Sequence, residues 1–327
     1  MLRNKSIAVV VPCFNEEGNI LNVLGSMPAF VDYIIVIDDA SQDETVNQVL
    51  QCADEDSRIR LLCLEENSGV GAAISKGHLF ARELDIDVVA VMAGDGQMDP
   101  KLLSKVVWPI VIDEADFTKT NRLFDSASTT DIPKHRFVGN FILSLFTKIA
   151  SGYWKISDAQ SGYTAIGKRG IQELSWEKMY PRYGQPNDLL ISLNILELRV
   201  ADIYTPPRYN VGEKSKMKIK RVIFTIPQIL WNGFWRRLWS KYVVKNSHPL
   251  VILFLSGFLA GIISLFLLLR ILLIFIMTGD VLLVSAILFS FSALFSLQSL
   301  SFAMWFDLQQ NEKLQLTYRL NEIIPEE

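Results

Sequence analysis

Acidic side chains follow two hydrophobic stretches in the first hundred residues. Asp38 and Asp39 come directly after one stretch, and Asp95 and Gln97 follow shortly after another. No Lys or Arg is adjacent in sequence to either group, and neighbouring carboxylates without a partner cost stability unless something binds to them. Carboxylate and amide oxygens suit a divalent cation. The pattern therefore predicts a nucleotide-sugar site, in which one group hydrogen-bonds the base or ribose and the other holds a cation on the diphosphate.

Both acidic groups also have a purely structural interpretation. Ser41-x-x-Glu44 matches a capping box, so the first pair of acids could serve a helix start, although Ser41 and Glu44 would satisfy that cap by themselves. Gly94-Asp95-Gly96 could be only a tight turn before a helix that begins near Pro100. We favour ligand binding for both groups, and the sequence leaves the structural alternatives open.

Strand-like and helical patterns alternate in the first 210 residues. The strand-like runs are apolar and β-branched without alternation, as expected for parallel strands that are covered on both faces. Ligands bind at the carboxyl ends of the strands in such sheets. We therefore expect an α/β fold with a mostly parallel open sheet. The expected strands are Ile7–Val11, Tyr33–Ile37, Ile59–Leu64 and Val88–Met92, and the expected helices are Glu17–Met27, Thr45–Cys52 and Ala72–Leu84.

Composition and spacing exclude several other classes of protein. The 327 residues carry 32 Lys and Arg against 35 Asp and Glu, a net charge of −3 that argues against nucleic-acid binding. The three cysteines and three histidines are too scattered for a disulfide framework or a zinc site. Gly69-Val70-Gly71 lacks the third glycine of a dinucleotide-binding motif, and the spacing of a phosphate-binding loop is not met either.

Two long uncharged runs predict a membrane hairpin. Pro249–Leu269 contains 21 residues, enough for a helix to cross a hydrocarbon core of about 30 Å. Val281–Phe306 is the second run, and the short Thr278-Gly279-Asp280 segment predicts a turn between them. Two buried core helices are the alternative interpretation. Gly257 and Gly261 are spaced for close helix packing and would support a homo-oligomer.

Cations gather immediately before the first uncharged run. The segment 213–248 holds nine Lys and Arg residues against Glu213 alone, interleaved with large apolar side chains. This composition predicts basic amphipathic helices in the headgroup layer of a bilayer, broken into two pieces at Pro227. The positive-inside rule places this segment, the N-terminal domain and both termini in the cytoplasm. The expected parts are a catalytic domain 1–212, juxtamembrane helices 213–248, two transmembrane helices 249–306 and a cytoplasmic tail 307–327.

Four stretches between residues 10 and 163 carry a family resemblance. They are Val10-Val11-Pro12-Cys13-Phe14-Asn15-Glu16-Glu17, Asp38-Asp39-Ala40-Ser41-Gln42-Asp43-Glu44-Thr45, Asp95-Gly96-Gln97-Met98-Asp99-Pro100 and Ser157-Asp158-Ala159-Gln160-Ser161-Gly162-Tyr163. In this order they resemble glycosyltransferase family 2, of the GT-A (Rossmann-like) fold, and within it the polyprenyl-phosphate glycosyltransferases such as dolichol-phosphate mannose synthase. The resemblance implies inverting transfer of a sugar from a UDP- or GDP-linked donor to an undecaprenyl- or dolichyl-type phosphate, as part of cell envelope glycan synthesis.

The resemblance also implies roles for individual residues. Asp95 and Gln97 would bind Mg²⁺ or Mn²⁺, although Ala93 stands where the family's Asp-x-Asp motif has its first acid. The remaining positions of a six-coordinate cation would then come from the diphosphate and water. The residues implied to contact the nucleotide sugar are Pro12, Asn15, Glu16, Asp38, Asp39 and Asp95.

Four cations are implied to hold the acceptor. Arg122 and Arg136 resemble the family's phosphate-binding arginines, and Arg208 and Lys216 lie in a similar segment near the membrane. Ordinary surface arginines are the alternative interpretation. A phosphate acceptor needs no strong base, whereas a hydroxyl acceptor would need one, and Asp188 is the best candidate. Transfer to a polysaccharide, or a non-catalytic membrane-tethered sensor of nucleotide sugars, are the alternative functions.

Overall fold

The computed structural model describes residues 2–121, 134–158, 160–205 and 219–325. Its contacts divide the chain into two compact units. The first unit comprises Met1–Phe234 and Lys313–Glu327, and the second comprises Trp235–Glu312.

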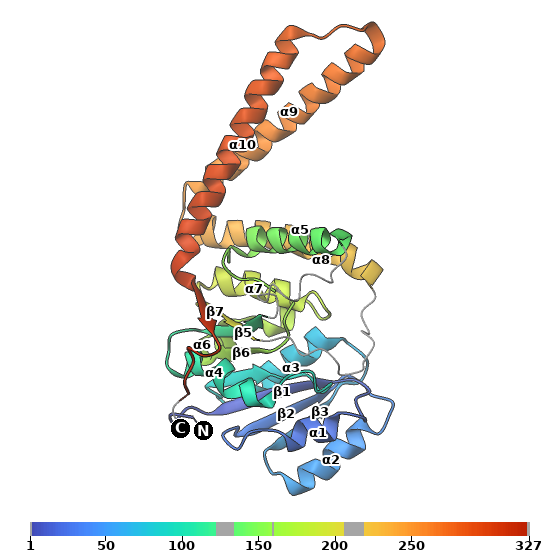
Figure 1. Cartoon of the computed structure of the whole chain (residues 1–327), viewed down its shortest axis with the longest axis vertical. Helices are drawn as coiled ribbons and strands as arrows, with labels where there is room; N and C mark the ends of the chain where they lie inside the picture. The colour runs from blue at the N-terminus through green and yellow to red at the C-terminus, as the bar shows by residue number, and fades with distance from the viewer. Residues whose placement is uncertain (1, 122–133, 159, 206–218, 326–327) are drawn as a thin grey trace. The chain divides into compact units, whose positions relative to one another are not determined.

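An eight-stranded sheet forms the centre of the first unit (Figure 1). The spatial order is β3-β2-β1-β4-β6-β5-β7-β8. Only β6 runs antiparallel to its neighbours among these strands, so the expected mostly parallel open sheet is confirmed. The strands are β1 Ile7–Cys13, β2 Tyr33–Asp38, β3 Ile59–Cys63, β4 Val88–Val91, β5 Phe117–Asn121, β6 Thr164–Gly167, β7 Val200–Tyr204 and β8 Gln315–Arg319.

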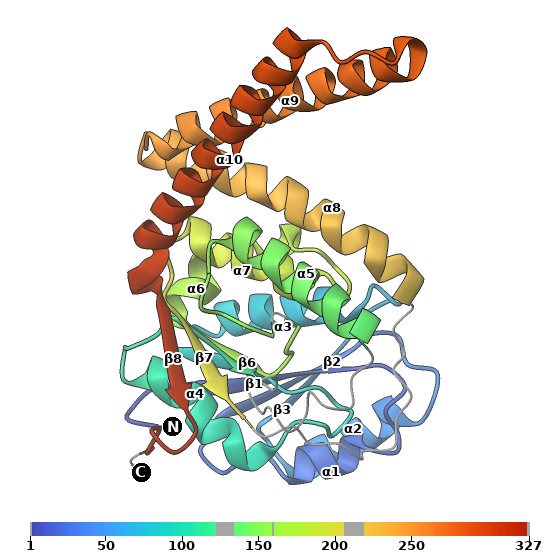
Figure 2. The same ribbon diagram turned by 45° about the horizontal axis from the view of Figure 1, so that its top comes forward.

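Helices cover both faces of the sheet, as Figures 1 and 2 show from two directions. Successive side chains of a strand point to opposite faces, so Val9 and Val11 join one buried core while Ala8 and Val10 join the other. The first core includes α1 Ile20–Gly25, α2 Thr45–Glu55 and α4 Leu103–Val111. The second core includes α3 Val70–Glu83, α6 Lys168–Glu173 and α7 Gln185–Ile195, and α5 Lys134–Ser151 contacts α7. Short 3₁₀ turns occupy Pro100–Leu102, Trp176–Lys178 and Glu312–Leu314.

The four expected strands and three expected helices are all present, with ends that differ by a few residues. The largest differences are three residues, at the start of α1, which begins at Ile20 rather than Glu17, and at the end of α2, which ends at Glu55 rather than Cys52. The segment 307–327, expected as a cytoplasmic tail, contributes β8 to the sheet, where Val200 pairs with Gln315. It adds there because the outer edge of β7 offers unpaired backbone N–H and C=O groups.

The basic segment is more continuous than expected. The helix α8 covers Ile219–Arg237 with Pro227 inside it, so the expected break at Pro227 is wrong. A proline removes one backbone hydrogen bond and can be tolerated when the rest of the helix is held by packing. A π-helical segment, Leu238–Lys245, follows directly in the second unit.

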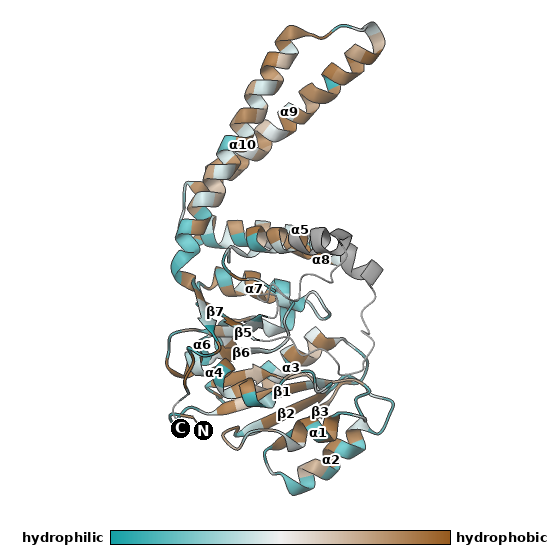
Figure 3. Cartoon of the chain, viewed as in Figure 1, coloured by the Kyte–Doolittle hydropathy of each residue, from teal (hydrophilic) through white to brown (hydrophobic). Residues whose placement is uncertain are grey.

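The second unit is an apolar helical hairpin. The helices α9 Leu250–Thr278 and α10 Leu283–Asn311 are long and apolar enough to cross a membrane by length and composition, and Figure 3 shows both mostly in the hydrophobic colour. Gly279 ends α9 with φ 77°, the left-handed conformation that glycine adopts readily. The turn predicted at Thr278–Asp280 is therefore confirmed.

The two glycines predicted for oligomer contacts face α10 instead. An added Cβ at Gly257 would lie 2.8 Å from Leu300 Cγ, and one at Gly261 would lie 3.0 Å from Ser296 Oγ. Ser296 Oγ donates a hydrogen bond to the Gly257 carbonyl over 2.8 Å. The close approach of helices is thus made within one chain, so this glycine pair gives no support to an oligomer.

A buried polar cluster lies at the base of the hairpin. Arg237 and Asp307, each 1% exposed, pair through two hydrogen bonds of 2.7 and 3.1 Å. The Tyr242 hydroxyl donates to Asp307, and Lys241 Nζ donates to Asn311 Oδ1 over 2.6 Å. Since buried charges are costly unless paired, these contacts fix how the helices of this unit meet.

Candidate active site

The carboxyl ends of β1 and β2 lie side by side and bring the first predicted residues together. In the parallel register Pro12 pairs with Ile37 and Cys13 with Asp38. The Asp39 N–H donates to the Cys13 carbonyl over 2.9 Å. Burial beside Asp38 raises the pKa of the Cys13 thiol, which keeps it protonated at neutral pH. This edge therefore presents carboxylates next to an uncharged thiol.

Backbone donors hold the carboxylate of Asp39. Its two oxygens accept the N–H groups of Ser68 and Gly69 over 2.7 and 2.9 Å. Gly69 directly precedes α3, so Asp39 joins the end of β2 to the start of α3. We expected this pair of acids to lack partners and considered capping of α2. The first expectation is wrong, because Asp39 is bound by N–H groups from a loop distant in sequence, and Asp38 Oδ2 accepts the N–H of Ser41 over 2.9 Å.

Asp39 also has a cation in its surroundings that local sequence did not indicate. Burial raises the pKa of its carboxyl, while the two backbone N–H groups and the positive charge of Arg182 oppose that increase. Arg182 lies on an exposed loop and donates from Nη2 to the Asn67 carbonyl over 3.3 Å. A guanidinium at this edge suits an anionic ligand.

The capping box predicted at the start of α2 is not formed. Ser41 Oγ instead accepts the N–H of Asn15 over 2.9 Å, and no side chain of Glu44 caps the helix. Asp43 Oδ1 accepts the N–H of Thr45 over 3.1 Å and serves the helix start in its place. The two loops that follow β1 and β2 therefore bind each other.

Further hydrogen bonds join the same two loops. Asn15 Oδ1 accepts the Gln42 N–H over 2.8 Å, and the Glu16 N–H donates to Thr45 Oγ1 over 2.8 Å. Asn15 has φ 55°, a conformation that asparagine tolerates better than most residues. The structure thus brings together Pro12, Asn15, Glu16 and Asp39, which the resemblance implies to contact the nucleoside, with Asp38 beside them.

Asp95 lies next to this group because β4 pairs with β1. The Gly94 N–H donates to the Pro12 carbonyl over 3.1 Å, which places Asp95 one residue beyond that contact. Asp95 Oδ1 accepts the Gln97 N–H over 3.0 Å around Gly96, whose φ is 70°. The tight turn considered from sequence is present. It still leaves Asp95 Oδ2 without a hydrogen bond to any described residue.

The structure offers limited ligands for a cation at this turn. Within the described part of the chain there is no group of three or more His, Cys, Asp or Glu residues that could hold a metal. The side chain of Ala93 carries no oxygen that could bind a cation, and its N–H points to Met98 Sδ at 3.4 Å. Asp95 and Gln97 fit a cation that takes its other ligands from a diphosphate and water.

Asp188 is tied to the same edge through one loop. It lies in the first turn of α7, is 7% exposed, and accepts the Tyr180 N–H at Oδ2 over 3.0 Å. The neighbouring Pro181 carbonyl accepts the Ala72 N–H over 2.8 Å at the start of α3. The loop before α3 also binds Asp39 through the Gly69 N–H. Asp39 and Asp188 are therefore linked through the start of α3 and the loop 180–184.

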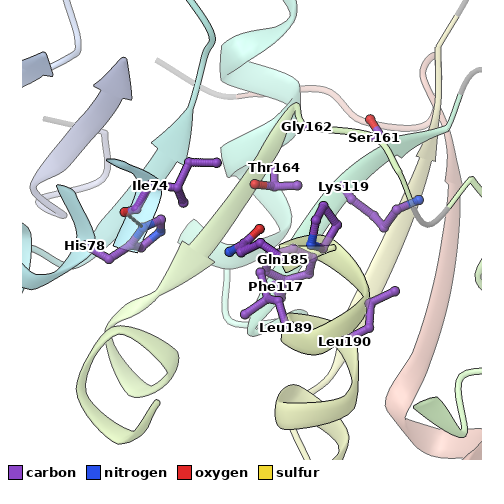
Figure 4. A pocket seen from close by; sticks show the side chains of 11 residues that line it. Ile74, His78, Phe117, Lys119, Ser161, Gly162, Thr164, Gln185, Leu189 and Leu190 are labelled. Atoms are coloured by element: carbon purple, nitrogen blue, oxygen red, sulfur yellow. Dashed lines mark hydrogen bonds between the residues drawn. The ribbon is translucent and has the colours of Figure 1, made fainter. Parts of the chain in front are cut away.

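A cavity of about 40 Å³ lies between α3, β5, β6 and α7 (Figure 4). Its lining combines apolar side chains with polar ones from α3, β5, β6 and α7. The lining includes Ile74, His78, Phe117, Thr164, Gln185 and Leu189. Sequence patterns gave no indication of this cavity, because its residues come from four elements.

A buried ion pair supports one wall of the cavity. Lys119 Nζ, from β5, donates to Asp202 Oδ1 of β7 over 2.8 Å and to the Ser157 carbonyl over 2.6 Å. Asp202 Oδ2 accepts from Asn121 Nδ2 over 2.8 Å and from the Ser157 N–H over 3.1 Å. These bonds fasten the beginning of the Ser157–Tyr163 stretch to the sheet.

The predicted acceptor residues are beyond what the structure describes. Arg122, Arg208 and Lys216 lie outside the described residues, as does the side chain of Arg136 in α5. Their roles therefore stay predictions.

Residues 8–175 match the family model described as glycosyl transferase family 2. The chain belongs to this family. This glycosyltransferase is 30% identical over 241 residues to the UDP-N-acetylglucosamine–dolichyl-phosphate N-acetylglucosaminyltransferase of Methanococcus voltae, covering 68% of this chain and 95% of that protein. It is 26% identical over 258 residues to a dolichyl-phosphate beta-glucosyltransferase of Trichomonas vaginalis, covering 74% and 77%.

The fold of this glycosyltransferase is similar to a solved GT-A structure. Glucosyl-3-phosphoglycerate synthase from Mycobacterium tuberculosis, crystallised with Mn²⁺, UDP and glucosyl-3-phosphoglycerate, superposes with a TM-score of 0.53. The sequence identity is 19%, and the match covers 71% of this chain and 81% of that one. The GT-A fold expected from the sequence is therefore confirmed.

Proposed function

We propose that this glycosyltransferase moves a sugar from a UDP- or GDP-linked donor to an undecaprenyl- or dolichyl-type phosphate at the cytoplasmic face of a membrane. The observation that carries the proposal is the cluster of Asp38, Asp39 and Asp95 at one edge of a family 2 sheet, in a chain with two membrane-length helices. The names of the relatives, which act on dolichyl phosphate, support the acceptor class.

The donor would lie across the carboxyl ends of β2, β1 and β4. Its nucleoside would contact the loops that hold Asn15, Glu16 and Asp39, which are fixed by the hydrogen bonds described above. Its diphosphate would lie toward Asp95. A site whose loops are already bonded together loses little conformational freedom when it binds a ligand.

A bound Mg²⁺ or Mn²⁺ would stabilise the negative charge that develops on the departing diphosphate. Asp95 and Gln97 are the residues that would hold it. The Mn²⁺ bound with UDP in the Mycobacterium tuberculosis synthase supports the use of a divalent cation.

The acceptor phosphate would act as the nucleophile. Its second pKa is about 6, so it is mostly dianionic at neutral pH and needs positioning more than a general base. A new bond forms between a phosphate oxygen and the anomeric carbon, while the bond from that carbon to the diphosphate breaks and its electron pair leaves with the nucleoside diphosphate. A single displacement of this kind inverts the anomeric centre. The cations proposed to hold the lipid phosphate are Arg122, Arg136, Arg208 and Lys216.

The charge of the segment before α9 supports the proposed topology. Nine cations against one acid favour the cytoplasmic side, and two spans would return the chain to that side. Cys63 is exposed whereas Cys13 is buried, so a membrane-impermeant maleimide reports the location of the first unit. Labelling of Cys63 in inverted vesicles but not in intact cells is expected, and the reverse pattern would refute the orientation.

Activity is tested in membranes that contain the full chain. They are given undecaprenyl phosphate or dolichyl phosphate and a labelled donor, UDP-glucose, UDP-N-acetylglucosamine or GDP-mannose, with and without EDTA. A lipid-extractable product that EDTA abolishes supports the proposal. Product on a water-soluble glycan would favour a polysaccharide acceptor, and donor binding without turnover across the panel would favour a sensor.

Two substitutions test whether Asp95, at the carboxyl edge of the sheet, takes part in the transfer. Asp95→Asn is expected to abolish transfer without affecting membrane insertion, because it removes the carboxylate proposed to hold the cation. Asp113→Asn is the matched control, since Asp113 is a surface residue paired with Lys5. Equal turnover by both variants would remove Asp95 from the site. Replacing Arg136 should raise the KM for lipid more than the KM for donor.

A further inference from the structure

Gln185 carries a buried hydrogen-bond donor that has no partner among the described residues. The residue is 3% exposed, and its Nε2 makes no hydrogen bond to any part of the chain that the structure describes, although it lines the cavity between α3 and α7. Figure 4 shows the Gln185 side chain extending from α7 into this space, with its nitrogen on the side of His78. Leaving a buried amide N–H unpaired costs free energy, so native structures usually supply a partner. Gln185 therefore points to a ligand that carries an acceptor.

His78 presents the complementary group. Its Nδ1 lies 2.8 Å from the Ile74 carbonyl, which only accepts, so Nδ1 carries the proton and Nε2 keeps its lone pair. The ring stacks on Trp176 with 4.0 Å between centroids. Burial lowers the pKa of His78 to about 4, so the ring is neutral at pH 7. Gln185 and His78 thus offer a donor and an acceptor to the cavity, whose lining also includes the polar residues Lys119, Ser161 and Thr164.

The volume and the lining of the cavity further restrict which ligands could bind in it. Its volume of about 40 Å³ compares with roughly 10–15 Å³ for one water, so it has room for about three waters or for one small group of about four bonded non-hydrogen atoms. Ile74, Phe117 and Leu189 supply apolar wall next to the two polar groups. A carbonyl, an N–H and a methyl group together make an acetamide.

The cavity is bordered by both parts of the proposed donor site. An added Cβ at Gly71, near the start of α3 that holds Asp39, would lie 2.7 Å from Gln185 Cβ. On another side Gly162 lines the cavity, and an added Cβ there would lie 3.2 Å from Met98 Cε. Met98 belongs to the turn that carries Asp95. A donor lying between Asp39 and Asp95 would therefore pass next to this space.

We propose that the cavity receives the N-acetyl group of the donor sugar, with Gln185 donating to the acetyl carbonyl and His78 accepting from the amide N–H. This inference rests on the proposed function and specifies its donor as an N-acetylated sugar nucleotide. Gln185 is then a specificity-determining residue. A cavity that holds only water would give no preference between N-acetylated and simple hexose donors.

The test compares donors that differ only in the acetamide. Lipid-linked product is measured with UDP-N-acetylglucosamine against UDP-glucose, and with UDP-N-acetylgalactosamine against UDP-galactose. Gln185→Met keeps the length of the side chain and removes its donor. We expect kcat/KM for the N-acetylated donors to fall about tenfold, as for loss of one buried hydrogen bond, and the values for the hexose donors to change less than about twofold. Gln172→Met is the matched control on the surface of α6, where Gln172 Nε2 contacts Asp85.

A binding measurement separates this inference from the proposed function. Titration calorimetry of the full chain with the same four nucleotides, without lipid, is expected to show tighter binding of the N-acetylated members and loss of that preference in Gln185→Met. Equal binding of both classes, or no binding of either N-acetylated donor, would overturn the inference. If the inference fails in this way, lipid-linked product from hexose donors would still support the proposed transferase function. Conversely, preferential binding of N-acetylated donors without any lipid-linked product would refute the proposed lipid acceptor and still support the acetamide pocket.

Discussion

Replacing Lys119, the buried cation at the wall of the cavity, tests whether its ion pair with Asp202 stabilises the first unit. Lys119 is 2% exposed and Asp202 is 0% exposed, so Lys119→Met leaves a carboxylate in the interior without its counter-charge. Breaking a buried pair on one side typically costs about 3–5 kcal/mol of folding free energy. Asp202 retains its hydrogen bonds from Asn121 and Ser157, which places the expected cost near the lower limit, at about 3 kcal/mol.

A double substitution isolates the electrostatic part of that cost. Lys119→Met with Asp202→Asn removes both charges while the amide oxygen can still accept from Asn121 or Ser157. We expect the double variant to be more stable than Lys119→Met alone by about 1–2 kcal/mol, within the usual range of coupling between residues in contact.

The assay is urea unfolding of the purified full chain in detergent, with amide hydrogen exchange in β5 and β7 to assign the loss to the first unit. Hydrogen exchange is needed because two units need not unfold in one step. A cost below about 1 kcal/mol for Lys119→Met would refute the reasoning. A double variant less stable than Lys119→Met would refute it as well, since it would show that hydrogen bonds rather than charge dominate.

Three further predictions follow from buried groups elsewhere. A folded-state pKa of about 4 for His78, below the unfolded value of 6.5, means that the unfolded chain binds more protons, so stability is present above pH 6.5 and is lost as the pH falls toward 4. Between pH 7 and pH 5 the free energy of unfolding of His78→Phe should therefore fall by roughly 2 kcal/mol less than that of the parent, as measured by urea titration. An equal fall in both proteins would contradict this prediction. Asp307→Leu should destabilise the hairpin by about 3–5 kcal/mol because it leaves Arg237 buried and unpaired, whereas adding Arg237→Leu should restore much of the thermal stability. Gly257→Leu should separate α9 from α10 near Leu300, seen as a loss of crosslinking between cysteines placed on the two helices, and unchanged crosslinking would count against the packing described.

Much of the first half of the fold is predictable because its strands are long apolar runs. Ile7–Cys13 and Tyr33–Asp38 are buried on both faces and show the expected continuous hydrophobic pattern. Phe117–Asn121 is equally buried yet reads Phe-Thr-Lys-Thr-Asn, and the charge of its lysine is balanced by Asp202 on another strand. Such a strand has no local signature, since the partner that permits it is distant in sequence.

The candidate site was predictable in its residue types and not in their bonding. Parallel strands place Asp38, Asp39 and Asp95 at one edge, as the sequence indicated. The N–H groups that hold Asp39 and the nearby charge of Arg182 come from loops whose positions depend on tertiary packing. The cavity residue Gln185 gave no signal because an unpaired amide is recognisable only when its surroundings are known.

The position of β8 in the chain has a consequence for biosynthesis. This strand completes the sheet beside β7, and Lys105 and Lys155 bond to the same C-terminal segment, at the Leu320 carbonyl and at Gln315 Oε1. Yet β8 leaves the ribosome only after both hairpin helices have been made. The sheet of the first unit therefore lacks its edge strand β8 until both apolar helices have been synthesised. Synthesis of the hairpin helices therefore precedes completion of the sheet, and a chain truncated before residue 315 would leave the edge of β7 unpaired and open to aggregation.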